Sequence, residues 1–222
     1  MTAFPIHTIQ TAPAGSQETL RTVKQTLGAI PSLAAGMAES PTLLRAFFAA
    51  REIYAQGTLT PIEIQALSIA IAVENRCAWC VAFHTGMALK EGIPDESLAA
   101  LRAGRDPAEP RLSALSTLAR AMIRNRGEVS EADLGRFLAA GWTRAQALEV
   151  VLGIGFSTMA NYAGHLIDAP LGPMLQSHEW VATKRESSVP DGAMSSGERA
   201  GGDRRGLGAG KVSEVRPGRG DT

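Results

Sequence analysis

Residues 60–84 read TPIEIQALSIAIAVENRCAWCVAFH, and this stretch decides the fold class. Thr60 and Glu63 have the spacing of a capping box, and Pro61 stands at the first helical position, where proline is favoured. A second helix is predicted to begin near Cys77 and to end near Lys90. The first helix carries apolar residues on every side, which is typical of a buried helix: Ile62, Ile64, Leu67, Ile69, Ile71 and Val73.

The rest of the chain shows the same helical pattern of apolar residues and N-capping side chains. Glycines at 153, 155 and 164 indicate close approach of another helix, because glycine otherwise weakens a helix interior. No strand pattern is found, so we expect an all-α fold with one domain over residues 1–180. Further helices are predicted at 16–27, 31–38, 41–56, 95–103, 111–126, from 131 onward, and at about 144–166.

The composition changes after Trp180. The residues beyond it are rich in glycine, serine, arginine and acids, and they hold few large apolar side chains. Such a segment cannot bury enough apolar surface to offset the entropy that it would lose on ordering. We therefore predict a disordered tail over residues 181–222.

The charge balance excludes some classes of partner. Lys+Arg and Asp+Glu both number 22 in 222 residues. Without a basic stripe there is no electrostatic basis for binding nucleic acid or an anionic membrane surface. No stretch reaches the ~18 uncharged apolar residues that span a bilayer, and residues 1–15 lack the features of a secretory signal. We expect a cytoplasmic protein, where thiols stay reduced and a close cysteine pair is more often catalytic or metal-binding than structural.

Both cysteines and one histidine fall at helical spacing as Cys77, Cys80 and His84. Residues three or four apart share a helix face, so the two sulfurs and the imidazole can line one stripe. The thiolate is the reactive form, and a free thiol has a pKa of about 8.5. The helix N-terminus and the adjacent Arg76 favour Cys77 as the anion, whereas His84, one turn on, favours Cys80. These arguments leave open which sulfur attacks a substrate.

The pattern Cys-x-x-Cys-x-x-x-His after Glu74-Asn75 resembles the AhpD-like alkylhydroperoxidase branch of the carboxymuconolactone decarboxylase family. The resemblance implies an AhpD-like helical bundle, thiol peroxidase activity and a trimer-based homo-oligomer. It also implies that Cys80 is the peroxidatic thiol and that Cys77 resolves it. The similarity covers about residues 15–178 and includes Ile30-Pro31, Met37, Ser40-Pro41, Asn161-Tyr162, His165 and Pro170-Leu171-Gly172.

The chain departs from the family pattern near the cysteines. The family's proton relay uses a glutamate twelve residues before the first cysteine, and that position is Gln65 here. Trp79 stands where the best-known members carry histidine, and Arg76 replaces a usual glycine. Because Gln65 cannot titrate, we expect Glu74, which adjoins the cysteines in sequence, to assist proton transfer. Glu63 is expected to serve its capping box instead.

The sequence therefore predicts a thiol-dependent hydroperoxide reductase with Cys80, Cys77, His84 and Glu74 at its centre. Its expected partners are a hydroperoxide substrate and a dithiol reductant. No cofactor is expected, because the Gly-Ile-Gly at 153–155 follows no strand and lacks the third glycine of a dinucleotide loop.

Two other functions fit the same cysteines. The first is a dithiol–disulfide oxidoreductase or redox sensor without peroxidase turnover. The second is a helical interaction protein with a structural cluster, in which Cys77, Cys80 and His84 are packed or bind zinc with His165 as a fourth ligand.

Overall fold

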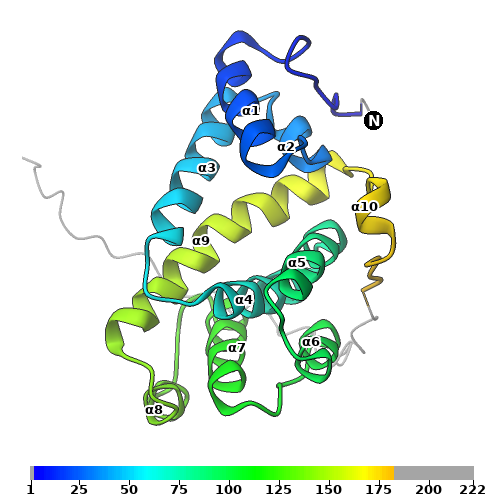
Figure 1. Cartoon of the computed structure of the whole chain (residues 1–222). Helices are drawn as coiled ribbons and strands as arrows, with labels where there is room; N and C mark the ends of the chain where they lie inside the picture. The colour runs from blue at the N-terminus through cyan, green and yellow to red at the C-terminus, as the bar shows by residue number, and fades with distance from the viewer. Residues whose placement is uncertain (1–2, 183–222) are drawn as a thin grey trace, which may run out of the picture. The chain divides into compact units, whose positions relative to one another are not determined.

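The computed structural model describes residues 3–182, and these form helices with no strand among them (Figure 1). The all-α class is confirmed, and each expected helix is present. α10 is the one helix in this range that the sequence pattern does not predict. The expected tail over 181–222 lies, apart from Val181 and Ala182, outside the described residues. The helices are α1 Ala14–Leu27, α2 Ser32–Met37, α3 Pro41–Ala55, α4 Pro61–Glu74, α5 Ala78–Lys90, α6 Asp95–Arg102, α7 Pro110–Arg124, α8 Glu131–Ala139, α9 Arg144–Ile167 and α10 Pro173–Gln176.

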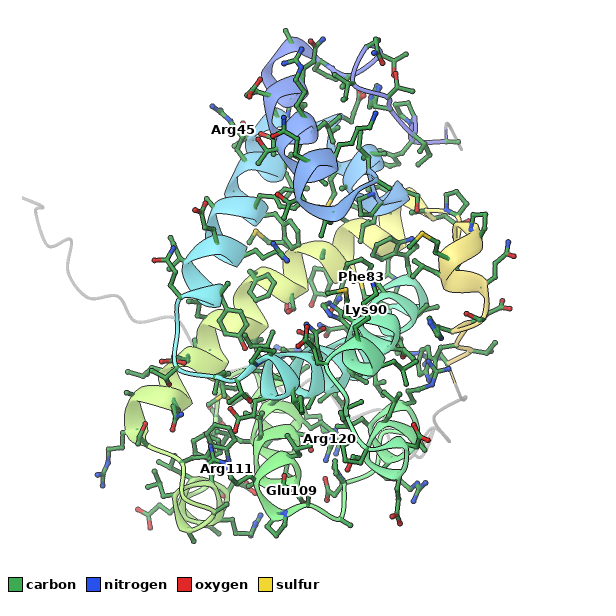
Figure 2. All side chains as sticks on the ribbon, viewed as in Figure 1. Arg45, Phe83, Lys90, Glu109, Arg111 and Arg120 are labelled. Carbon is green, nitrogen blue, oxygen red and sulfur yellow. The ribbon has the colours of Figure 1, made fainter. Side chains whose placement is uncertain are left out.

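α4 packs against α5, α6, α7 and α9, which explains why its sequence is apolar on all sides. The expected capping box begins it. The Thr60 amide donates to Glu63 Oε2 at 2.8 Å, and the Glu63 amide donates to Thr60 Oγ1 at 3.4 Å. Glu63 also forms an ion pair with Arg111 at 2.9 Å. Figure 2 labels Arg111 at the lower end of α7. Glu63 therefore has a structural role, as expected.

The glycines of α9 differ in their surroundings. A Cβ at Gly153 would lie 3.1 Å from Tyr54 and Leu67 atoms, and one at Gly164 would lie 3.1 Å from Cys77 Sγ. Both glycines permit close approach, as the sequence predicts. A Cβ at Gly155 would meet no side chain or other helix within 4 Å among the described residues, so no other helix of the same chain approaches closely at that position.

α9 also corrects the expectation that no stretch is apolar enough to span a bilayer. An 18-residue window of this 24-residue helix has a mean hydropathy of 1.3, so its length and composition meet that criterion. The helix nevertheless packs on α2, α3, α4, α5 and α7, and 44% of the window is buried inside the protein. A helix in the core of a protein can meet the same criterion of length and hydropathy. Its outer face holds Tyr162, which is 61% exposed, whereas a tyrosine in so apolar a helix is expected by default to pack in the core.

Candidate active site

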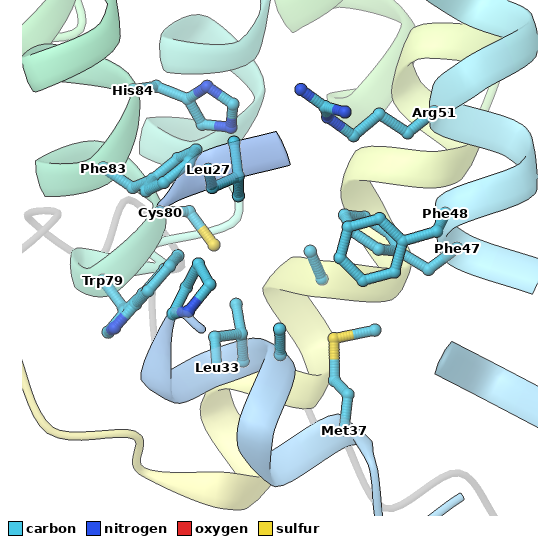
Figure 3. A pocket seen from close by; sticks show the side chains of 13 residues that line it. Leu27, Leu33, Met37, Phe47, Phe48, Arg51, Trp79, Cys80, Phe83 and His84 are labelled. Atoms are coloured by element: carbon cyan, nitrogen blue, oxygen red, sulfur yellow. The ribbon is translucent and has the colours of Figure 1, made fainter. Parts of the chain in front are cut away.

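A cavity opens between α1, α2, α3, α5 and α9, with Cys80 and His84 in its wall (Figure 3). The empty space in and around it, open solvent included, is about 540 Å³. Phe47 and Phe48 pack against the core, and they also face this space. The lining is mainly apolar and consists of Leu27, Pro31, Leu33, Ala34, Met37, Phe47, Phe48, Arg51, Trp79, Cys80, Phe83, His84 and Ala160.

Cys77 is the N-cap of α5 and does not line the cavity. Its Sγ accepts a hydrogen bond from the Cys80 amide at 3.3 Å, as a side chain at the positive end of a helix can. The hydrogen bond from the Cys80 thiol is the largest cause that lowers the pKa of Cys77. The amides of Cys80 and Trp79 and the Asn161 side chain act in the same direction, against the opposing effect of burial.

Cys80 lies in the first turn of α5, and its sulfur faces the cavity (Figure 3). The hydrogen bond with Cys77, burial and the negative charge on Cys77 together hold the pKa of Cys80 well above its usual range. The two thiols therefore titrate as a pair. When the pair has lost one proton, the charge lies on Cys77 and the remaining proton lies on Cys80.

Asn161 of α9 is a site residue to which the sequence analysis gave no role. Its buried side chain forms hydrogen bonds with both sulfurs and lowers the pKa of each. Asn75 Nδ2 donates to Asn161 Oδ1 at 2.8 Å, which leaves the Asn161 NH₂ group for the cysteines. His165 Nε2 in turn donates to the Asn75 carbonyl at 2.7 Å. A lone amide in the apolar part of α9 is the only sequence signal for this network.

His84 is held by the residue at the family's relay position. Its Nδ1 lies 2.8 Å from Gln65 Oε1, and because an amide oxygen only accepts, Nδ1 carries the proton and Nε2 carries the lone pair. Burial, and secondly the charge of Arg51, lower the pKa of His84 to about 4. The imidazole is therefore neutral at pH 7, and it is too weak a base to remove the proton from Cys80 by itself.

Trp79 and Phe83 form an aromatic wall next to Cys80. Their rings stack with centroids 5.2 Å apart and planes 13° from parallel. Trp79 Nε1 donates to Ser32 Oγ at 2.9 Å, and Ser32 Oγ donates to the Pro170 carbonyl at 2.7 Å. These contacts fix the Trp79 ring in the cavity wall beside Cys80.

Glu74 is close to the cysteines in sequence, but its side chain has a different partner. Both of its carboxylate oxygens bind Arg124 of α7, with the Arg124 Nε to Glu74 Oε2 distance at 3.0 Å. The Glu74 side chain is 3% exposed, and it does not line the cavity. These contacts favour a structural role, whereas the sequence predicts a proton relay. The relay role of Glu74 stays a prediction that this geometry does not support.

A Glu74→Gln variant distinguishes the two roles. If the ion pair is structural, the free energy of unfolding should fall by about 1–3 kcal/mol, as for a charged hydrogen bond that loses one partner. The rate of the folded protein should stay close to that of wild type. Thermal unfolding and peroxide consumption by the same samples give both values. A rate lower by ~10² or more, with unchanged stability, would return Glu74 to the mechanism.

The zinc alternative has no support among residues 3–182. No group of three or more His, Cys, Asp or Glu side chains in that range is arranged to hold a metal ion. His165, the proposed fourth ligand, directs its Nε2 to the Asn75 carbonyl. His84 directs its Nδ1 to Gln65.

Comparison with known proteins supports the resemblance seen in the sequence. Residues 41–121, from the start of α3 into α7, match the model of the carboxymuconolactone decarboxylase family. None of the curated proteins matches the chain.

Three solved structures show the same fold. The alkylhydroperoxidase AhpD core of an uncharacterised peroxidase-related protein from Ralstonia eutropha JMP134 is 23% identical, with a TM-score of 0.68 over 78% of this chain and 93% of that one. A peroxidase-related protein from Silicibacter sp. TM1040 is 18% identical, with a TM-score of 0.65 over 78% and 92%. A cysteine-to-alanine variant of the debrominase Bmp8, in complex with 2,3,4-tribromopyrrole, is 15% identical, with a TM-score of 0.65 over 80% and 96%. The AhpD-like fold is thereby confirmed.

Proposed function

We propose that this chain, whose residues 41–121 match the model of the carboxymuconolactone decarboxylase family, is a thiol-dependent hydroperoxide reductase. The observation that carries the proposal is the division of roles between the cysteines. Cys80 lines the cavity with His84, and Cys77, whose pKa is lowered by the hydrogen bond from the Cys80 thiol, lies outside the cavity wall. A pair with one accessible thiol and one adjacent thiolate supplies both attack and resolution.

Cys77 is the base for the first step. The hydroperoxide O–H donates to His84 Nε2, which positions the peroxide beside Cys80. The Cys80 sulfur attacks the hydroxyl oxygen, and the O–O bond breaks. The thiol proton passes to Cys77 and then to the departing alkoxide, which leaves as the alcohol. Cys80 is now a sulfenic acid.

The second step closes the disulfide. Cys77, again an anion, attacks the sulfenic sulfur and expels hydroxide, which solvent neutralises. Two electrons have then passed from the two sulfurs to the peroxide. A dithiol reductant reduces the disulfide by thiol exchange and returns the pair to its starting state. Neither step needs Glu74 or a charged His84.

The runner-up is a general dithiol–disulfide oxidoreductase. Each cysteine is only 2% exposed, so the disulfide of another protein could not reach Cys80 without a rearrangement. The cavity instead admits a small molecule. This burial favours a peroxide over a protein disulfide as the oxidising substrate.

Peroxide consumption with a panel of dithiol reductants tests the proposal. The wild-type protein should consume cumene hydroperoxide in proportion to the reductant oxidised, and Cys80→Ser should not. Reduction of insulin disulfides by the same preparations provides the comparison with the runner-up. Insulin reduction without hydroperoxide turnover would reject the peroxidase proposal.

We also propose that the protein is cytoplasmic. We further propose that it self-associates through α9. The exposed side of this helix holds large apolar residues at helical spacing: Leu148, Val151, Leu152, Tyr162 and Leu166. Gly155 lies among them, with open space around it. Helices can approach closely at such a stripe, and a trimer-based assembly is the form that the family resemblance implies.

Light scattering at micromolar concentration should therefore give a mass above that of one chain. Leu148→Glu should shift the distribution toward monomer, because it would bury a charge in the contact. Val181→Glu changes an apolar residue that is equally exposed outside α9, and it should have no such effect. A monomeric wild-type protein would remove this part of the proposal.

A further inference from the structure

Arg51 is the one side chain in the cavity wall whose charge is fixed. It comes from α3 and is an exposed residue, and its side chain extends toward His84 in the cavity wall (Figure 3). No acidic side chain within residues 3–182 lies at ion-pair distance from it.

The surroundings of Arg51 make this position unusual. Apart from Cys80 and His84, its neighbours in the wall are mainly apolar or aromatic, among them Leu27, Phe47 and Phe48. The charge also opposes protonation of His84. The reaction outlined above leaves Arg51 without a task, since neither the attack nor the resolution needs a cation there.

We propose that Arg51 binds a carboxylate of the substrate, and that the substrate is therefore an organic hydroperoxide with an apolar body and an anionic group. The inference rests on the proposed function. The hydroperoxide group lies at Cys80 and His84, the body lies against Trp79 and Phe83, and the carboxylate meets the guanidinium. A guanidinium presents paired N–H donors that match the two oxygens of a carboxylate. Hydrogen peroxide would fill neither the apolar wall nor the site at Arg51.

The test compares substrates that differ only in charge. Cumene hydroperoxides that carry a ring carboxylate, in the meta or the para position, are compared with their methyl esters. For at least one isomer, the wild-type kcat/KM should favour the acid over the ester by about tenfold or more, as for a hydrogen bond to a charged group. In Arg51→Gln this ratio should fall to about one, and Arg51→Lys should retain part of it. Any effect of Arg51 on His84 changes kcat/KM for the acid and for the ester alike, so it cancels in the acid-to-ester ratio.

Arg45→Gln is the matched control. Arg45 is also on α3, but it lies toward the other end of that helix (Figure 2), donates to the Pro41 carbonyl and does not line the cavity. Its removal should leave the acid-to-ester ratio unchanged. Equal ratios in wild type and Arg51→Gln would overturn the inference and leave the peroxidase proposal intact.

A binding measurement keeps the two proposals separate. The alcohol products, as acids and as esters, are titrated against the fluorescence of the protein, whose Trp79 lines the cavity. The acid should bind about tenfold more weakly to Arg51→Gln than to wild type, whether or not the protein turns over peroxide. An acid that binds both proteins equally would also overturn the inference. Absence of hydroperoxide consumption by the wild type would reject the proposed function alone.

Discussion

In Cys77→Ser, a hydroperoxide should convert Cys80 to a sulfenic acid that persists and can be trapped. Attack survives in this variant because Cys80 still faces the cavity, whereas resolution does not, because the second thiol is gone. The attack should nevertheless be slower than in wild type by about 10²-fold or more, since the base that receives the Cys80 proton has been removed. In Cys80→Ser, attack should fall by at least about 10³-fold, as expected for loss of a nucleophile.

Mass spectrometry with a sulfenic-acid trap, on both variants and at matched times, decides the order of the two cysteines. Cys77 is the more acidic thiol, so acidity alone would make it the attacking sulfur. Access to the cavity makes Cys80 the attacking sulfur. Trapping at Cys77 in the Cys80→Ser protein, as fast as wild type reacts, would reverse the assignment.

Asn161→Asp should raise the pKa of the cysteine pair and lower the rate at neutral pH. The change replaces an NH₂ group that stabilises both sulfurs with a carboxylate, and a like charge nearby disfavours the thiolate by about 1–3 pH units. The fraction of the pair in the anionic form at pH 7 should therefore fall. The rate should recover as the pH rises toward the new pKa. The pH profile of single-turnover oxidation measures this shift.

Asn161→Leu is the matched control for the charge. It also removes the donor to the sulfurs, but it adds no negative charge, so its pH profile should shift less than that of Asn161→Asp. Circular dichroism of each variant checks that the helices are intact. Identical profiles for the two variants would mean that Asn161 acts through packing and not through its electrostatic effect on the sulfurs.

Much of the fold could be predicted because the signals are local. Thr60 and Thr143 each begin a helix with a capping box, and both boxes are formed in the structure. Gly28 ends α1 in a left-handed conformation with φ 76°, as a glycine after a helix should. α10 was missed because its four residues are too few for a helical period, and Gly172 gives no side-chain cap.

The site could be predicted only where its residues are neighbours on one helix. Cys77, Cys80 and His84 follow from the spacing within α5. Asn161 and Arg51 come from α9 and α3, and no local pattern predicts which buried amide or exposed arginine will meet the cysteines.

Glu74 illustrates the opposite limit. It stands three residues before Cys77, but it ends a helix whose last turn directs the carboxylate toward α7 and Arg124. Proximity along the chain therefore does not by itself show which side chain a residue contacts. The exposed position of Tyr162 could not be predicted either, because the sequence of a helix as apolar as α9 does not reveal which of its sides is covered.

The central claim is that Cys77 and Cys80 form a dithiol that reduces a hydroperoxide directly, and a single-turnover titration tests it most simply. The fully reduced protein is mixed with one equivalent of cumene hydroperoxide without reductant, quenched with a thiol-alkylating agent and analysed by intact mass and peptide mapping. We expect one equivalent of alcohol, a mass lower by two hydrogens, and a disulfide between Cys77 and Cys80. Two alkylated cysteines and unreacted hydroperoxide after prolonged incubation would contradict it.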